Sequence, residues 1–425
     1  MRKYILAFLC CAGTLTGMAQ MKNTIRGRVV QGETGAAISG ASVFITNTSR
    51  GTVSDSSGAF ELLNVPDGSY DLIVSSIGFE TQAYTYKAEQ LPLRLEVRLK
   101  PRVEELQTVV VEPDEKNGWQ RFGQFFIDNF IGTNENGRYC RIKNYNTLRF
   151  RYSQKKGILK VLADEPLIIE NKALGYRVKY QLENFYFNYK NRMLIFYGYS
   201  LFSELDEKGP SRRQLRNREK AWNGSIMHFM YSLYHDSLAA EGFEVRRMTQ
   251  RPNEEKQRVR QVYREAMKVN EPVASDNLSV QRLPGIGIVS TRPATRNRGI
   301  SDSSAYYNNV LRQPDIISEY GKTLLTADSL LTTTGTKTKS LFFTNYLYIV
   351  YKKEDEDWDY LRYTGEGRQP YSIQRSSAFL PDSTAVTIAA TGNYYPPQSF
   401  MTLGYWAWDE KIGNLLPLDY RKYDK

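Results

Sequence analysis

The sequence predicts a mainly β protein in two parts: an N-terminal β-sandwich and a second, α+β domain built on a large antiparallel sheet with helices. Between residues 24 and 100, short apolar stretches are separated by turns containing Gly and Asp at a spacing of roughly eight to twelve residues, which is typical of a sandwich. Between residues 148 and 202 apolar and polar side chains alternate, whereas residues 211–240 show helical spacing. The 30 tyrosines also favour strands, because aromatic side chains suit a pleated, half-buried surface.

Residues 1–19 are predicted to be a signal peptide. Arg2 and Lys3 provide a positive start, and the apolar run that follows, Tyr4–Cys11, is too short to span a bilayer. Small residues before the bond between Ala19 and Gln20 predict cleavage there. Neither cysteine of this segment follows a small residue, which disfavours lipidation. We therefore expect an exported protein, located in the periplasm, associated with the outer membrane, or secreted.

Composition limits the mature chain further. The full sequence carries 57 Lys and Arg against 46 Asp and Glu, and the mature chain stays basic after Arg2 and Lys3 are lost. Cys140 would then be the single cysteine, so no internal disulfide is expected and the fold must be stabilised by its core. Because no later stretch approaches the ~18 apolar residues of a membrane helix, we expect no transmembrane segment in the mature chain.

The predicted sandwich occupies residues 20–112. Leu93, Leu95, Val97 and Leu99 alternate with charged residues, which indicates a strand with one buried face. A turn is expected at 55–58, where Asp can bond its own backbone and Gly accepts positive φ. A linker is expected at 113–118, followed by the α+β domain over 119–425.

The sandwich segment resembles the carboxypeptidase-regulatory-like domain, a transthyretin-like β-sandwich. Five short pieces carry this resemblance, in the order and at the spacing of that family: Ile25–Val29, Ile38–Val43, Gly51–Phe60, Val65–Tyr70 and Ser76–Phe79. In the family, this module often precedes TonB-dependent outer-membrane transporters, and the run Leu106–Val111 resembles the segment that follows it there. The resemblance thus implies a small β-sandwich and suggests an accessory role beside such a transporter.

Two activities associated with that family are disfavoured by the rest of the sequence. A transporter barrel needs many ten-residue alternating strands and usually ends in an aromatic residue, whereas this chain ends at Lys425. Zinc carboxypeptidases use a His-x-x-Glu pair, but Tyr231 and Leu238 stand three residues after the two histidines, His228 and His235. We therefore expect neither a barrel nor a zinc peptidase.

The second domain resembles envelope proteins that pair this sandwich with one long C-terminal region, a resemblance that implies no known activity. It is carried by Phe125–Gly132, Asp164–Tyr176 and Gly404–Trp408. Periodicity predicts helices and strands along this region. The expected elements are a helix at 119–130, strands from 148 to 202, helices at 211–240 and 254–269, a loop-rich stretch at 273–308, a hairpin of 340–351 with 358–363, and a helix at 408–416.

Few residues suggest a metal or a catalytic group. His228 and His235 lie seven residues apart, about 10.5 Å along a helix, too far to share one ion. The acidic run 354–359 matches some positions of a calcium loop, but Tyr360 replaces the required Gly, so a solvated hairpin turn explains it better. The turn at 55–58 is likewise explained by backbone geometry alone. We expect no cofactor and no metal.

Two surface features are candidate binding residues. Arg212, Arg213, Arg216 and Arg218 form a basic stretch on a predicted helix, and basic residues recur from 246 to 260. Because the protein is expected to be exported, these suit an anionic membrane surface, lipopolysaccharide or an acidic partner rather than nucleic acid, unless they are simply a solvated helix face.

The second feature is aromatic. Tyr405, Trp406 and Trp408 fall where alternation on a strand would place both indoles on one face, a candidate sugar-stacking platform, although core packing explains them better.

The preferred hypothesis is a non-enzymatic exported cell-envelope protein that acts through binding or assembly, its partner an envelope protein, a glycan or an anionic membrane surface. One alternative is a glycan or peptide hydrolase that uses Asp or Glu residues of the second domain as acid and base. Another is an accessory component of a TonB-dependent outer-membrane transporter. The first of these alternatives requires two carboxylates that face each other in a deep cleft.

Overall fold

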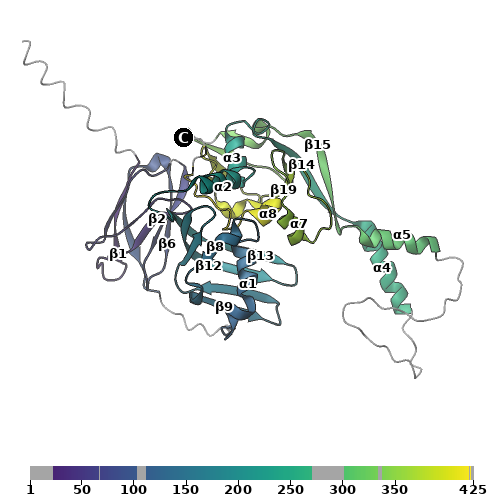
Figure 1. Ribbon diagram of the computed structural model, residues 1–425, viewed down its shortest axis with the longest axis horizontal. Helices are drawn as coiled ribbons and strands as arrows, with labels where there is room; N and C mark the ends of the chain where they lie inside the picture. The colour runs from purple at the N-terminus through teal and green to yellow at the C-terminus, as the bar shows by residue number, and fades with distance from the viewer. Residues whose placement is uncertain are drawn as a thin grey trace, which may run out of the picture. The chain divides into compact units, whose positions relative to one another are not determined.

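The computed structural model describes residues 23–66, 68–102, 112–269, 301–333, 337–420 and 422 (Figure 1). The predicted signal peptide with its cleavage site at Ala19 and Gln20, and the run 106–111, lie outside these residues. The chain divides into two compact units, one formed by Met1–Arg246 with Thr323–Lys425 and the other by Arg247–Lys322. Within the described ranges, no helix is both long and apolar enough to cross a membrane.

The N-terminal module is a two-sheet β-sandwich, as predicted. One sheet has the order β4-β1-β7 and the other β3-β2-β5-β6. Alternate residues of β1, β5 and β7 point inward, and Val29, Leu72 and Val97 are fully buried between the sheets. The strands are β1 (Ile25–Gln31), β2 (Ser42–Ile45), β3 (Gly51–Val53), β4 (Ala59–Leu62), β5 (Ser69–Ser75), β6 (Gln82–Lys87) and β7 (Leu93–Leu99).

The first part of the second region is an antiparallel sheet of six strands with one helix packed on it. Helix α1 (Gly118–Phe130) buries Phe122, Phe126 and Phe130, spaced four residues apart, against this sheet. The longest strands, β12 and β13, form a hairpin whose inward side chains include Phe185 and Phe202. The strands are β8 (Cys140–Ile142), β9 (Leu148–Ser153), β10 (Ile158–Ala163), β11 (Leu167–Asn171), β12 (Tyr176–Asn188) and β13 (Met193–Glu204).

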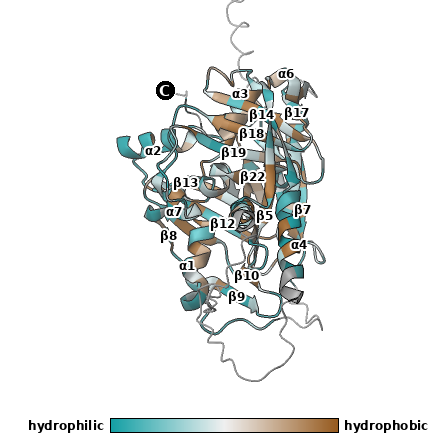
Figure 2. Cartoon of the chain, turned by 90° about the vertical axis from the view of Figure 1, so that its right-hand side faces the viewer, coloured by the Kyte–Doolittle hydropathy of each residue, from teal (hydrophilic) through white to brown (hydrophobic). Residues whose placement is uncertain are grey.

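The described residues of the second region also form two further antiparallel sheets and, outside the smaller unit, five more helices. One sheet has the order β15-β14-β18-β19-β22 and the other β16-β17-β20-β21. Their strands are β14 (Phe243–Pro252), β15 (Ile316–Leu324), β16 (Leu331–Thr333), β17 (Thr338–Leu341), β18 (Tyr346–Tyr351), β19 (Gln374–Phe379), β20 (Val386–Ala389), β21 (Tyr394–Tyr395) and β22 (Met401–Gly404). The helices are α2 (Arg212–Trp222), α3 (Ile226–Tyr234), α6 (Ala327–Leu330), α7 (Trp358–Thr364) and α8 (Tyr405–Asp409). Colouring by hydropathy shows the exposed α2 as mostly polar (Figure 2).

The smaller unit contains α4 (Glu254–Val269), α5 (Ser301–Arg312) and parts of β14 and β15. Ion pairs connect these elements: Arg251 meets Glu319 at 2.6 Å, and Asp315 accepts from both Lys256 and Arg260 at 2.9 Å. Helix α4 confirms the helix that was predicted at 254–269. The loop-rich prediction for 273–308 is wrong for 301–308, which are helical, and the rest of that range lies outside the described residues.

Three predicted elements differ from the structure. The helical stretch 211–240 is two helices, because Gly224 has a φ of +71° and a Cβ there would lie 2.7 Å from the Tyr351 ring. The segment 358–363 is helix α7 rather than a strand, and β18 pairs with β19 instead. The predicted C-terminal helix at 408–416 is replaced by the shorter α8, which begins at Tyr405.

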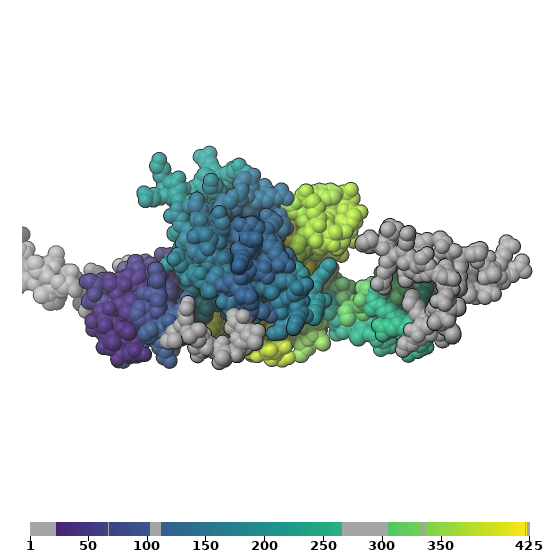
Figure 3. Space-filling model, turned by 90° about the horizontal axis from the view of Figure 1, so that it is seen from below, coloured from purple at the N-terminus to yellow at the C-terminus, as the bar shows by residue number. Residues whose placement is uncertain are grey.

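The sandwich contacts the second region directly (Figure 3). The turn after β2 lies against β13, where the Asn47 amide donates to the Ser200 carbonyl at 2.7 Å and the Phe202 amide donates to the Thr48 carbonyl at 2.9 Å. The same sheet of the sandwich makes a second contact, where the Asn393 side chain donates to the Ser69 carbonyl at 3.0 Å. These hydrogen bonds connect the sandwich to the second region, and the surface where they meet is called the junction.

Candidate ligand-binding groove

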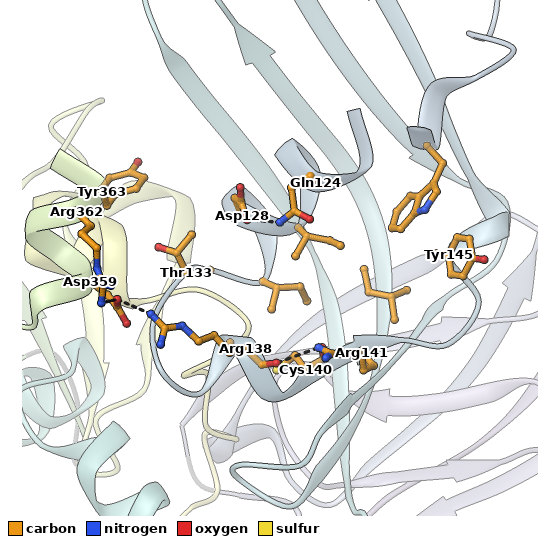
Figure 4. Close-up of a pocket in the computed structure, with 16 residues that line it drawn as sticks. Gln124, Asp128, Thr133, Arg138, Cys140, Arg141, Tyr145, Asp359, Arg362 and Tyr363 are labelled. Atoms are coloured by element: carbon orange, nitrogen blue, oxygen red, sulfur yellow. Dashed lines mark hydrogen bonds and ion pairs between the residues drawn. The ribbon is translucent and has the colours of Figure 1, made fainter. Parts of the chain in front are cut away.

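A groove of about 850 Å³ lies between α1 and α7, with β8 along its base (Figure 4). Part of its lining is apolar, formed by Ile127, Ile131, Ile142 and Cys140. Its ends differ in chemistry: Trp119 and Tyr145 close one end, and Asp359, Arg362 and Tyr363 close the other. The groove therefore combines apolar surface with charged and aromatic groups, as small-molecule sites do.

The first wall is positioned by α1. Its phenylalanines fix the helix on the sheet, so that Gln124, Ile127 and Asp128 face the groove. Gln124 donates to Asp128 at 2.7 Å, one turn later on the same face. Gly123 is required at its position, because a Cβ there would lie 2.8 Å from the Trp119 indole. The missing side chain lets that ring lie close against its own helix.

The aromatic end of the groove is a stacked pair. The ring centroids of Trp119 and Tyr145 are 4.6 Å apart and their planes differ by 24°. Trp119 also contacts the buried Phe150, with centroids 6.3 Å apart, which anchors the pair to the sheet. Tyr145 is 46% exposed, far more than a ring used only for core packing. This pair offers a rigid apolar surface with polar edges to a ligand.

The opposite wall is held together by one buried carboxylate. Asp359, on α7, is 7% exposed and pairs with two guanidinium groups, those of Arg138 and Arg362. Arg138 comes from the segment that leads into β8, so this carboxylate joins both sides of the groove (Figure 4). The nearby Arg141 donates to the carbonyls of Arg138 and Cys140 at 2.9 and 2.7 Å. Several polar groups that line the groove are thus hydrogen-bonded or ion-paired within the protein.

The loop that connects α1 to β8 is held by hydrogen bonds within the loop and by one from the C-terminal segment. Gly132 ends the helix with a φ of +102°, and the Asn134 side chain accepts from the Gly137 amide at 2.8 Å. Trp408 donates its indole N–H to the Thr133 hydroxyl at 2.9 Å. The loop therefore depends on the C-terminal segment for its shape.

Cys140 in the groove lining is not a reactive thiol. Burial raises the pKa of the Cys140 thiol to about 12, so the thiol is protonated at neutral pH. Its sulfur instead donates to the Asn136 carbonyl at 3.6 Å. It therefore contributes apolar surface, not a nucleophile.

The predicted aromatic platform is not on the surface. Tyr405, Trp406 and Trp408 belong to helix α8 rather than a strand, and they are 6%, 3% and 2% exposed. Trp406 donates to the Gly224 carbonyl at 2.7 Å within the core. Tyr405 and Trp408 both contact Tyr360 of α7, with centroids 5.1 and 5.5 Å away. They support the walls of the groove from inside the core and do not line it.

The predicted basic stretch is divided by the structure. Arg212, Arg213 and Arg216 are exposed on α2, consistent with a charged surface. Arg218 is not a surface residue: it is 4% exposed, forms two hydrogen bonds with Glu204 at 3.0 and 2.6 Å, and lies 3.7 Å over the Tyr176 ring. It holds α2 against the end of the β12–β13 hairpin.

The remaining candidates have structural roles. His228 is 1% exposed, accepts from the Gly224 amide at 3.1 Å and contacts Glu241 at 3.2 Å, while burial lowers the pKa of the His228 imidazole to about 4. His235 bonds a backbone carbonyl. Asp55 accepts from the amides of Ser57 and Ala59, which makes the turn. Among the described residues, no group of three His, Cys, Asp or Glu side chains could hold a metal ion.

The acidic run 354–359 is not a solvated hairpin turn, because Glu356 and Asp359 are buried in ion pairs and Asp357 caps α7.

The residues that line the groove could not be identified from the sequence. Trp119, Arg138, Tyr145 and Asp359 are far apart in the sequence and belong to no motif. The only local signal was the cap pattern of α7, Asp357 before it and Gly365 after it.

Comparisons with known proteins cover the two regions unequally. Residues 25–111 match the model of the CarboxypepD_reg-like domain. A type II cohesin–X-dockerin complex from Acetivibrio cellulolyticus is 25% identical over 18% of this chain and 52% of that chain, with a TM-score of 0.16. This chain therefore spans about half the length of that protein. No curated protein matches the sequence.

Two structures from Bacteroides are similar at low identity. A proposed carbohydrate-binding protein from Bacteroides uniformis is 11% identical over 43% of this chain and 80% of that chain, with a TM-score of 0.14. A proposed membrane-associated protein of unknown function from Bacteroides fragilis is 11% identical over 89% of this chain and 99% of that chain, with a TM-score of 0.16. The matched residues and the two packed sheets together identify the N-terminal module of this chain as a carboxypeptidase-regulatory-like domain.

Proposed function

We propose that this chain is an exported, non-enzymatic protein of the cell envelope, in the periplasm or at the outer membrane, and that it binds a glycan in the groove between α1 and α7. The observation that carries this proposal is the Trp119–Tyr145 stack, whose Tyr145 ring is 46% exposed, beside side chains that are hydrogen-bonded or ion-paired within the protein. The predicted signal peptide and the N-terminal sandwich support the envelope location.

The chemistry of the groove suits a sugar. A sugar ring has an apolar C–H face, which packs on an aromatic ring, and a rim of hydroxyl groups, which need donors and acceptors. Tyr145 provides the exposed ring, while Gln124, Asp128 and Arg141 provide the polar groups. These groups are bonded within the protein, so little conformational entropy is lost when a ligand binds. The volume of about 850 Å³ is within the range of ligand sites.

The test is an array of neutral, N-acetylated and acidic oligosaccharides of two to eight units, followed by calorimetric titration of the sugars that bind. Tyr145→Ala should weaken binding about tenfold, or ~1.4 kcal/mol, since it removes the exposed ring. Tyr197→Ala is the matched control, because Tyr197 is 57% exposed but does not line this groove.

Two results would contradict the proposal. Absence of binding to every class of sugar, with peptides captured instead on a matched peptide array, would exclude a glycan ligand. Shortening of a bound oligosaccharide during prolonged incubation, followed by mass spectrometry, would show a hydrolase.

A further inference from the structure

We infer that the binding surface continues across α7 into a second hollow, and that the ligand is therefore an oligosaccharide of several units rather than a single sugar. This inference rests on the proposed function. The second hollow, about 630 Å³, is formed by Trp358, Leu361, Arg362 and the loop Gly365–Gln369. Arg362 lines both this hollow and the groove, so the two are neighbours along one helix.

The second hollow repeats the chemistry of the groove. Trp358, at the start of α7, is 54% exposed, although a Trp is among the costliest side chains to leave in water. Tyr363, at the other end of the same helix, is 56% exposed and lines the groove. Each hollow thus has an exposed aromatic ring of α7 beside the shared guanidinium of Arg362.

The polar wall of the second hollow is held rigid from the core. Glu356 is 4% exposed and bonds Arg368 at 2.6 Å, the Tyr371 amide at 3.1 Å and Arg375 at 3.6 Å. The guanidinium carbons of both arginines lie 3.9 Å from the Tyr371 ring centre. Arg368 also bonds the exposed Glu366 at 2.6 Å. A buried carboxylate therefore fixes this wall, as Asp359 fixes the wall of the groove.

The spacing of the two hollows sets the length of the ligand. They share Arg362, and their exposed rings, Trp358 and Tyr363, are five residues apart on α7, about 7.5 Å along its axis. A single sugar ring is shorter than this and can contact one hollow only, whereas a chain of several units can contact both. Binding at the second hollow should then add affinity only for long ligands, because the two contacts are linked.

The experiment measures the affinity of two-unit and six-unit forms of the same array-selected sugar for the purified protein. Trp358→Ala should weaken binding of the six-unit sugar about tenfold and change binding of the two-unit sugar less than twofold. Tyr145→Ala should weaken both, and Tyr197→Ala neither. Trp358→Phe, which keeps an aromatic ring, should restore most of the affinity, and unchanged circular dichroism would establish that each variant is folded.

The failures of the two proposals are distinguishable. If six-unit and two-unit sugars bind equally well, or if Trp358→Ala leaves the six-unit affinity unchanged, the extended site is overturned while the groove remains a sugar site. If no sugar binds at any length, the proposed function itself fails.

Discussion

Three consecutive residues, Asp409 at the end of α8 and Glu410 and Lys411 after it, are ionisable and partly buried, which is costly unless their charges are neutralised. Burial raises the pKa of Asp409 to about 6 and that of Glu410 to about 8, and it lowers the pKa of Lys411 to about 8. Glu410 accepts from the Ile226 amide at the start of α3, at 2.7 Å. It is therefore largely protonated at neutral pH and caps that helix as a neutral acid.

This predicts a dependence of stability on pH. Because the pKa of Glu410 is higher in the folded state than its ordinary value of 4.5, folding takes up a proton between pH 4.5 and 8. The contribution is complete below pH 4.5 and is lost as the pH rises through 8, at up to ~1.4 kcal/mol per pH unit. Urea unfolding at pH 5 to 8 should show a shallower decline for Glu410→Gln than for the wild type. Parallel curves, or the same effect in the exposed control Glu207→Gln, would contradict this assignment.

The same substitution at two neighbouring arginines of α2 should change the free energy of unfolding by very different amounts. Arg218→Ala leaves the buried Leu174 carbonyl and the exposed Glu204 without their donor and should lower the free energy of unfolding by about 2 kcal/mol. Arg216→Ala, on the exposed face, should change it by less than about 0.5 kcal/mol. Chemical denaturation measures both. Equal effects would mean that the pairing seen at Arg218 does not stabilise the fold.

Residue identity alone could not separate these arginines. Arg212, Arg213, Arg216 and Arg218 look alike in the sequence, and only the approach of Glu204 and Tyr176 from a distant hairpin buries one of them. The aromatic residues show the same limit. Trp119 and Trp408 are both tryptophans, and the sequence does not distinguish them. Packing places Trp119 in the groove and Trp408 behind the loop that borders it.

Long elements were predictable and short ones were not. Helix α1 and the strands between 148 and 202 have enough periods for their apolar pattern to fix both type and buried face. Helix α7 has seven residues, and its burial comes from Asp359 and Leu361 alone, so alternation over 358–363 suggested a strand. Helix α8 is shorter still, and its aromatic residues are buried on more than one side, which removes any periodic signal.

The loop that follows α7 should depend on one carboxylate. Glu356→Gln removes the charge that bonds Arg368 and Arg375, and a buried pair broken on one side is costly. We expect trypsin to cut after Arg368 several times faster, and amide exchange in 365–373 to rise, with little change in β12 or β13. Glu366→Gln, which changes the exposed partner of the same arginine, is the control and should leave both rates near those of the wild type.

At the scale of the larger unit, the sandwich is joined to the second region by a small set of polar contacts. The Asp419 carboxylate accepts from the Ser49 amide at 2.9 Å and the Ser49 hydroxyl at 2.5 Å, and it lies 3.3 Å from Arg50. The Leu418 amide donates to the Asn47 carbonyl at 2.7 Å. The predicted linker at 113–118 and the domain limits on either side of it stay predictions, but these bonds argue against a sandwich that moves independently.

If the junction couples the two parts, removing its best-bonded side chain should uncouple them. Asp419→Ala deletes two hydrogen bonds and an ion pair, worth about 1–3 kcal/mol together. The amides of Asn47 and Phe202, which bond across the junction, should then exchange faster, while the amides of β5 and β12 keep their protection because each core stays intact. The exposed Asp382→Ala is the control. Unchanged exchange at Asn47 and Phe202 in the Asp419 variant would mean that the backbone hydrogen bonds alone hold the junction together. Faster exchange throughout β5 would mean that the sandwich needs the Asp419 contact to stay folded.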